Sequence, residues 1–124
     1  MINTVRLFLF ILLLGSASWA QAAAPFISGG VSAEERAQID AAADQYNVKV
    51  TFADRKDNSY LSAVEVTVTE TLRNRLAVQT LTKGPFLLMN LPQGDYILEA
   101  VSNGRKVRQE LKVQNAKTDT VVTL

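Results

Sequence analysis

The sequence of 124 residues contains neither cysteine nor histidine. Without cysteine there are no disulfides, no thiol nucleophile and no thiol on which a lipid anchor is built. Without histidine there is no imidazole base, and the usual ligands of zinc and copper are missing together with cysteine. Any catalysis would therefore depend on carboxylates or on a serine and lysine pair. We expect a non-enzymatic protein with no cofactor and no metal site.

Tryptophan and one-sided charge are also scarce. The single tryptophan, Trp19, lies in an apolar leader, so the rest of the chain has no indole on which a sugar ring could stack. Lysine and arginine number 13 against 12 aspartates and glutamates, and the leader holds one of these cations, Arg6. Without the leader, 12 cations balance 12 anions. This balance, spread along the chain, argues against nucleic acid or anionic lipid as a partner.

The leader has the order of a secretory signal peptide. Arg6 precedes the apolar run Leu7–Leu14, and small residues follow. The run is well short of the ~20 apolar residues that span a bilayer, although an uncleaved anchor is the alternative. Three triplets carry small residues at the first and third positions before a cut: Ser18-Trp19-Ala20, Ala20-Gln21-Ala22 and Ala22-Ala23-Ala24. We expect residues 1–23 to be removed, leaving a soluble periplasmic protein with no stable membrane insertion.

The mature chain of about 100 residues predicts one domain. Residues 24–31 are expected to form an extended arm, whose Phe26 and Ile27 are candidates for adding a strand to a partner's sheet. Ser28-Gly29-Gly30 is interpreted as a flexible arm, with an anion cradle as the less favoured alternative.

Residues 32–47 carry the signals of one amphipathic helix. Ser32 and Glu35 have the spacing of a capping box at its start. Four residues recur on one face at helical spacing: Ile39, Ala42, Ala43 and Tyr46. Asn47 is expected to end the helix in the left-handed conformation. The adjacent acids Glu34 and Glu35 suit the positive end of a helix dipole better than paired acid–base catalysis.

Residues 48–124 change to an alternating pattern that predicts seven short strands. These are residues 48–52, 63–70, 76–82, 85–90, 95–103, 106–114 and 119–124. The third shows a break in phase at Leu81 that predicts a bulge or a partly two-sided strand. The fourth is apolar on both faces, as in a covered strand. Asn103-Gly104 is a strong hairpin signal. No helix separates the strands, so we predict a seven-stranded antiparallel β-sandwich with one N-terminal helix.

Within this pattern, residues Tyr60 to Leu124 resemble a carboxypeptidase regulatory-like domain. The resemblance depends on Gly84 and Phe86 and on a leucine-proline-x-glycine-x-tyrosine turn formed by four residues: Leu91, Pro92, Gly94 and Tyr96. It implies a transthyretin-like or surface-protein B-type sandwich with Greek-key connections, of the kind found in small exported proteobacterial proteins. Such domains serve as accessory or structural modules, so the resemblance implies little about function. Hydroxyisourate hydrolases share the transthyretin-like fold, but their chemistry requires histidine.

The turn is interpreted as a folding device. In immunoglobulin-like sandwiches a tyrosine at such a corner donates its hydroxyl hydrogen bond to the backbone upstream. We therefore predict that the Tyr96 hydroxyl bonds to the backbone near Leu91.

The functional hypothesis is a module that binds an envelope protein or cell-wall component through the helix face, the arm or an edge strand. Tyr60, in a loop, is a third candidate contact residue. The alternatives are a carboxylate-dependent envelope enzyme or subunit, and a small-ligand carrier with a cleft between helix and sandwich. The loop Asp54–Asn58 could offer oxygens to calcium, but its own cations favour a solvated loop.

Overall fold

The computed structural model describes residues 24–124, and the predicted signal peptide lies outside them. Helix α2 (Ala33–Ala42) continues into a 3₁₀ turn at Ala43–Gln45. The strands are β1 (Phe26–Gly29), β2 (Val48–Ala53), β3 (Glu65–Glu70), β4 (Arg75–Leu81), β5 (Phe86–Met89), β6 (Gly94–Ser102), β7 (Arg105–Val113) and β8 (Thr118–Thr123).

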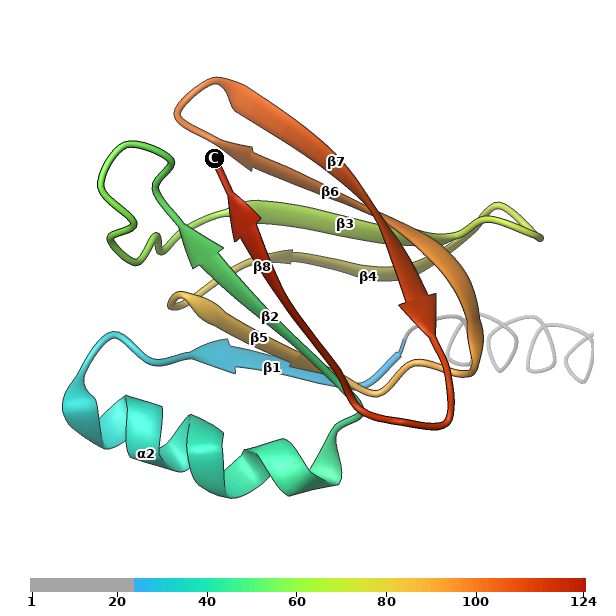
Figure 1. Cartoon of the computed structure of the whole chain (residues 1–124), viewed down its shortest axis with the longest axis horizontal. Helices are drawn as coiled ribbons and strands as arrows, with labels where there is room; N and C mark the ends of the chain where they lie inside the picture. Colours follow the sequence, from blue (N-terminus) through green and yellow to red (C-terminus); the bar gives the residue numbers. More distant parts are fainter. Residues whose placement is uncertain (1–23) are drawn as a thin grey trace, which may run out of the picture.

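The strands form two four-stranded sheets, with the orders β1-β5-β2-β8 and β4-β3-β6-β7 (Figure 1). The prediction of a mainly β fold with two antiparallel-rich sheets and one helix is confirmed. Two details were wrong. There are eight strands, since the predicted arm supplies β1, and β8 runs parallel to β2. A four-residue strand is too short to show an alternating pattern, and parallel pairing depends on where the chain crosses between sheets.

The arm is extended as expected, but β1 pairs with β5 of the same chain, from Phe26 opposite Met89 to Gly29 opposite Phe86. The Phe26 side chain packs against the main core. The sheets therefore begin before the helix.

Gly30, just after β1, and Gly84, just before β5, are packed closely, which corrects the interpretation of Ser28-Gly29-Gly30 as a flexible arm. A methyl group on Gly84 would stand 2.3 Å from the carbonyl carbon of Gly29. Gly30 has a φ of +102°, and a methyl group there would stand 2.4 Å from the Phe86 ring. Glycine is required at these positions because the backbones touch and one φ is positive.

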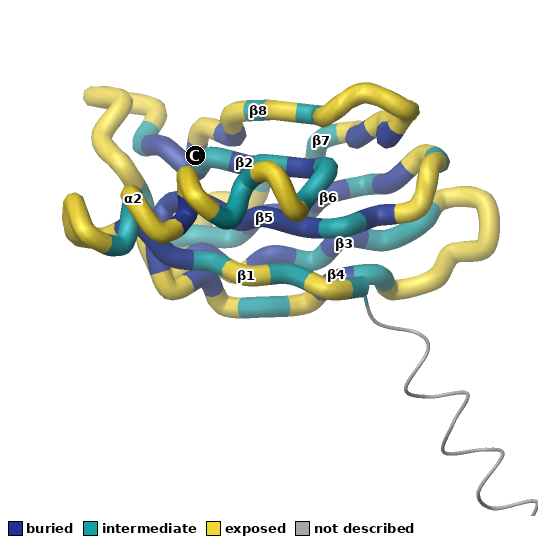
Figure 2. The backbone as a smooth tube through the Cα atoms, turned by 90° about the horizontal axis from the view of Figure 1, so that it is seen from below, coloured by how far each residue is buried: buried dark blue, intermediate teal, exposed yellow. Residues whose placement is uncertain are grey.

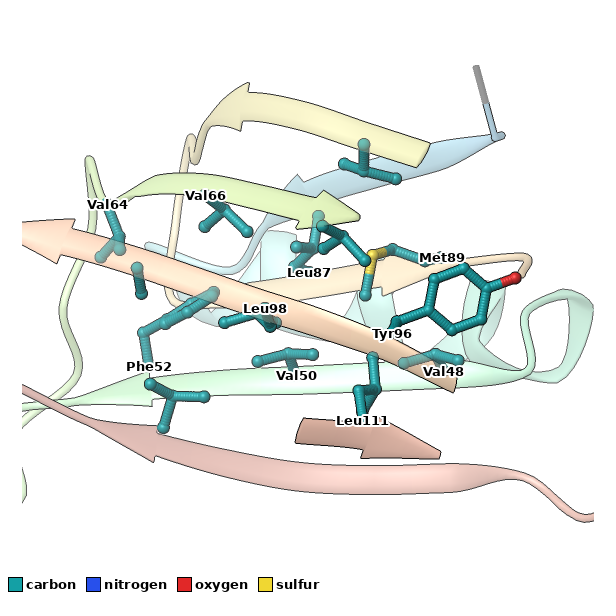
Figure 3. Close-up of a cluster of buried hydrophobic side chains, with 14 of the residues drawn as sticks. Val48, Val50, Phe52, Val64, Val66, Leu87, Met89, Tyr96, Leu98 and Leu111 are labelled. Atoms are coloured by element: carbon teal, nitrogen blue, oxygen red, sulfur yellow. The ribbon is translucent and has the colours of Figure 1, made fainter. Parts of the chain in front are cut away.

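The main core lies between the sheets and is made of the inward residues of the alternating strands (Figure 3). The predicted inward residues of the segments that form β2, β3, β6 and β7 point into it as expected; among them Val50, Phe52 and Val68 are completely buried. Burying each such side chain contributes about 1.5–3 kcal/mol. Figure 2 shows the same pattern as buried segments in both layers.

Strand β5 is buried on both faces, as its sequence predicted. Leu87 and Met89 face the main core. Phe86 and Leu88 face outward, where Ile39 of α2 covers them together with the partly buried side chains of Ala42, Ala43 and Tyr46. The predicted apolar face of the helix is thus confirmed.

The helix start is also confirmed, whereas its predicted end is wrong. Ser32 Oγ accepts from Glu35 N at 3.1 Å, and Ser32 N donates to Glu35 Oε2 at 3.2 Å. Asn47 does not adopt the left-handed conformation. Its side chain instead pairs with the backbone of Leu91, donating to the carbonyl oxygen at 2.7 Å and accepting from the N–H at 2.9 Å. Asn47 therefore ties the helix end to the turn after β5.

Asn90 completes this connection. Its Oδ1 accepts from Asn47 N at 3.1 Å, and its Nδ2 donates to the carbonyl oxygen of Gln45 at 2.8 Å. The four bonds of Asn47 and Asn90 satisfy backbone groups that neither sheet pairs. We call this pair the asparagine clasp.

Two local sequence signals of the strands are confirmed, and the place of a third is corrected. Asn103 and Gly104 have φ values of 50° and 76°, and Ser102 pairs with Arg105 across them, as in a two-residue hairpin. A bulge is present in the predicted strand, but it lies opposite Val68 and Thr69 rather than at Leu81, which pairs regularly with Glu65. The Tyr96 hydroxyl donates to the carbonyl oxygen of Pro92 at 2.7 Å, within the turn that also contains buried Leu91.

We predict that Tyr96→Phe lowers the free energy of unfolding by about 1 kcal/mol, because a partly buried hydrogen bond is lost and the Pro92 carbonyl loses its partner. Urea unfolding monitored by circular dichroism measures the change. Tyr60→Phe is the control, since Tyr60 is exposed and its hydroxyl has no hydrogen bond within residues 24–124. If the Tyr96→Phe protein were as stable as the parent, the hydrogen bond from Tyr96 to Pro92 would not stabilise this turn.

We predict that Gly84→Ala lowers the free energy of unfolding by about 1–3 kcal/mol, because the new methyl group must displace the Gly29 backbone. Gly29→Ala is the matched control, because Gly29 is the other residue of this close contact. Its methyl group would meet only Ile39, at an ordinary 3.7 Å. Thermal unfolding of both variants tests the difference, and a Gly84→Ala protein as stable as the control would refute the close contact.

Candidate binding site: a groove beside helix α2

Helix α2 covers only part of the outer face of the first sheet, and β8 lies clear of it (Figure 2). Next to the helix is a hollow of about 540 Å³, which we call the α2 groove. Its lining comes from α2, β2, β5, β8 and the loop before β3. The residues are Arg36, Asp40, Lys49, Thr51, Ala53, Asn58, Tyr60, Phe86, Asp119 and Val121.

The floor of the groove is aromatic. The ring of Tyr60 meets Phe86 edge-on, with ring centroids 5.2 Å apart. Lys49 Nζ lies 4.9 Å from the centroid of the Phe86 ring. Phe86 is buried, whereas Tyr60 is 56% exposed and Val121 is 57% exposed. Large apolar side chains that stay half-exposed beside a hollow provide contact area for a ligand or partner.

The loop before Tyr60 is held by turns that its own carboxylates make. Asp54 Oδ1 accepts from Lys56 N at 2.7 Å, and Asp57 Oδ1 accepts from Ser59 N at 3.0 Å. The bond from the Ser59 N–H holds the pKa of Asp57 below its usual value. Asp54 and Asp57, which the sequence analysis considered as possible calcium ligands, thus form the turns of the loop. A backbone bridge between Ala53 and Tyr60 then holds the Tyr60 backbone beside β2.

The rim of the groove carries two cations, Arg36 and Lys49, and two anions, Asp40 and Asp119. Lys49 Nζ lies 4.0 Å from Asp40 Oδ1, and Asp40 is largely exposed, so this pair contributes little to stability. The balanced rim favours a ligand without strong net charge. The chemistry of the site is therefore recognition by apolar contact with polar groups around it.

The outer edge of β8 borders the groove. Thr118 N donates to the carbonyl oxygen of Asn47 at 2.8 Å, and Leu124 N donates to that of Ala53 at 3.0 Å. Because successive residues of a strand face opposite edges, the backbone groups of residues 119, 121 and 123 point away from β2. No further strand follows β8 in this sheet within residues 24–124.

The two edge strands on this side of the molecule differ in charge. β7, the edge of the second sheet, bears five charged residues, which discourage pairing with another chain: Arg105, Lys106, Arg108, Glu110 and Lys112. β8 carries one charge, at Asp119. Gln109 Nε2 donates to Thr120 Oγ1 at 2.8 Å and ties the two edges together. β8 is thus the less protected edge of the pair.

The three contact residues proposed from the sequence do not form one site. Tyr60 lies in the α2 groove, whereas Ile27 lines a smaller hollow with Gly30 and Gln38. Phe26 is half-buried against the main core. The turn residues Leu91, Pro92 and Tyr96 line a third hollow, and Gly94 begins β6.

Sequence reasoning missed the partners of Tyr60 in the groove. Val121 is an apolar residue at an outward position of β8, between Asp119 and Thr123, and this departure from alternation was the available signal. Phe86 and Lys49 had no comparable signal, because their neighbourhood arises from the pairing of β5 with β2.

Among residues 24–124, no helix has the length and apolar character needed to cross a membrane. A scan against protein-family models found no match for this chain, and neither did a search of curated proteins.

Proposed function

We propose that this chain is an exported, non-enzymatic binding module that takes up an extended segment of an envelope protein at the β8 edge and the α2 groove. We assign it a periplasmic location and a sandwich of the transthyretin-like or carboxypeptidase regulatory-like type. The signal-peptide pattern and the turn residues Leu91 to Tyr96 support these assignments. The observation that carries the proposal is an open strand edge lying directly beside a half-exposed aromatic groove.

An added strand would use both features together. The free backbone groups of Asp119, Val121 and Thr123 would supply main-chain hydrogen bonds, as in other cases where a peptide extends a sheet. Alternate side chains of the added segment would point to the outer face, where Tyr60 and Val121 offer apolar contact. The balanced charges at the rim suit a segment of low net charge.

The small-ligand carrier is less well supported. The groove volume falls within the range of about 300–1,000 Å³ that is usual for ligand pockets. Such pockets bury about 70–90% of a ligand, however, and a floor with Tyr60 and Val121 more than half exposed is too open for that. The groove favours a ligand that continues along the surface.

The carboxylate enzyme is also less well supported. Glu35 is engaged by the backbone of Ser32, and Asp40 faces Lys49 at the groove rim. Each of these carboxylates thus already has a partner that is not an acid, whereas paired acid–base catalysis depends on two carboxylates that act on one substrate.

We predict that a photo-crosslinking amino acid at Tyr60 or Val121 captures a discrete envelope protein in living cells. The same amino acid at Gln79, an exposed position on β4 in the other sheet, is the matched control. Immunoblots and mass spectrometry of the adducts provide the measurement. Identical adducts at all three positions, or none at Tyr60 and Val121, would overturn the proposal.

We predict that Val121→Lys reduces the Tyr60 adduct at least ten-fold, because a lysine on an edge strand opposes pairing with another chain. The substitution is at an exposed position and should change the free energy of unfolding by less than about 0.5 kcal/mol. Gln79→Lys makes the corresponding change on β4 and should leave the adduct intact. An undiminished adduct in the Val121→Lys protein would show that β8 is not the contact.

A further inference from the structure

The third hollow, lined by the turn residues Leu91, Pro92 and Tyr96, has a volume of about 500 Å³ and lies at the end of the molecule where the β3–β4 hairpin meets the turn after β5. We call it the Glu70 pocket. Its walls are mostly apolar and are formed by Ala24, Pro25, Leu76, Ala77, Leu91, Pro92 and Tyr96. Its polar residues are Asn47, Glu70, Arg75 and Asn90.

The strand register places the Glu70 carboxylate in this pocket. Glu70 is on the same face of β3 as the buried residues Val66 and Val68, and it pairs with Tyr96 of β6. The bulge in β4 skips Ala77, so that Leu76 pairs with Thr69, and Arg75 pairs with Glu70. An acidic residue thus takes a core-facing position at the end of an apolar strand.

One oxygen of this carboxylate is buried without a hydrogen-bond partner in residues 24–124, although the side chain as a whole is 24% exposed. Arg73 Nε is 3.9 Å from Glu70 Oε1, which is too far for a hydrogen bond, and the Arg73 side chain is 63% exposed. A buried acceptor without a donor is costly, especially when it is charged. Within residues 24–124 this oxygen thus has no hydrogen bond, and the exposed part of the Glu70 side chain borders the pocket.

The Tyr96 hydroxyl and the Asn47 and Asn90 amides form their hydrogen bonds with backbone groups and not with Glu70. The hydroxyl donates to Pro92, and the two side-chain amides donate to backbone carbonyls in the asparagine clasp. Burial raises the pKa of Tyr96, and the negative charge of Glu70 raises it further. The negative charge of Glu70 thus acts on the Tyr96 hydroxyl, another group that lines the pocket.

We propose that the Glu70 pocket binds a primary ammonium group on a short aliphatic stem, with Glu70 as its counter-ion. An ammonium group brings three charged donors, which form the strong class of hydrogen bond to a carboxylate. The apolar walls accommodate the stem. Arg75 at the rim opposes a second positive charge, which restricts the ligand to a single cation.

Two sources can supply such a group. A free alkylamine can enter from solvent. The chain itself supplies one if residues 1–23 are removed as the sequence predicts, because the new α-ammonium group is then on Ala24, a residue of the pocket wall. Ala24 N already donates to the Ala77 carbonyl oxygen at 2.9 Å in the pocket wall.

The first experiment tests the ammonium chemistry. Every strand of the described chain lies between Phe26 and Thr123, so a chain with Gly-Ser-Gly-Ser placed before Ala24 keeps both sheets and has its terminus displaced. n-Butylamine is titrated into this chain and followed by NMR of the glutamate carboxyl carbons, with n-butanol as the neutral probe. We expect a saturable shift at Glu70 with the amine and none with the alcohol.

Two variants assign the effect to Glu70. Glu70→Gln should weaken butylamine binding at least ten-fold, followed at the amides around Tyr96. Glu65→Gln is the matched control, because Glu65 is on the same strand but on the outer, exposed face. An equal response to amine and alcohol, or equal affinities of both variants, would overturn the proposal. The parent comparison of amine with alcohol stands even where Glu70→Gln impairs folding.

The second experiment distinguishes the sources. The full chain is exported with its own leader, and intact mass identifies the new terminus. If that terminus occupies the pocket, butylamine binding is lost in the processed chain, and Glu70→Gln lowers its folding equilibrium constant about ten-fold more than in the extended chain. Butylamine binding to both chains indicates an external amine. The proposal that the pocket binds an ammonium group is refuted if two results occur together. Butylamine does not bind to the extended chain, and Glu70→Gln destabilises the processed chain no more than the extended one.

Discussion

The fold depends on β5 being buried on both faces and paired on both edges. β1 and β2 flank it in the sheet, the main core lies on one side, and α2 lies on the other. The close approach of Gly84 to Gly29 sets the entry to β5, and the asparagine clasp sets its exit. A strand of four residues thus organises the helix, one sheet and the turn that leads into the other sheet.

The position of α2 decides where binding surface remains. The helix covers Phe86 and Leu88 but stops short of β8, so the outer face is apolar and partly open where helix and strand diverge. The same clasp that ends the helix also borders the Glu70 pocket through Asn47 and Asn90. Both candidate sites therefore lie where the helix and its attachment leave the sheets incompletely covered.

The sequence predicted those parts of the fold that arise from local patterns. Alternation predicted seven strands, the capping box predicted the helix start, and Asn103-Gly104 predicted a hairpin, because each signal lies within a few neighbouring residues. The missing parts required contacts distant in sequence. β1 has only four residues, and Asn47 gave a helix-ending signal although its side chain bonds to Leu91. Tyr60 could likewise be proposed as a contact residue, whereas its neighbours Phe86 and Lys49 could not, because the pairing of β5 with β2 brings them together.

The first sheet joins β1, near the beginning of the described chain, to β8 at its end. Its contacts span nearly the whole sequence, and such topologies fold slowly because long loops must close before pairing stabilises them. The β2–β8 ladder cannot form until the last residues are available. For a chain that we propose to be exported, this delay keeps the first sheet incomplete until the C-terminal strand has emerged, which favours passage across the membrane as an unfolded chain.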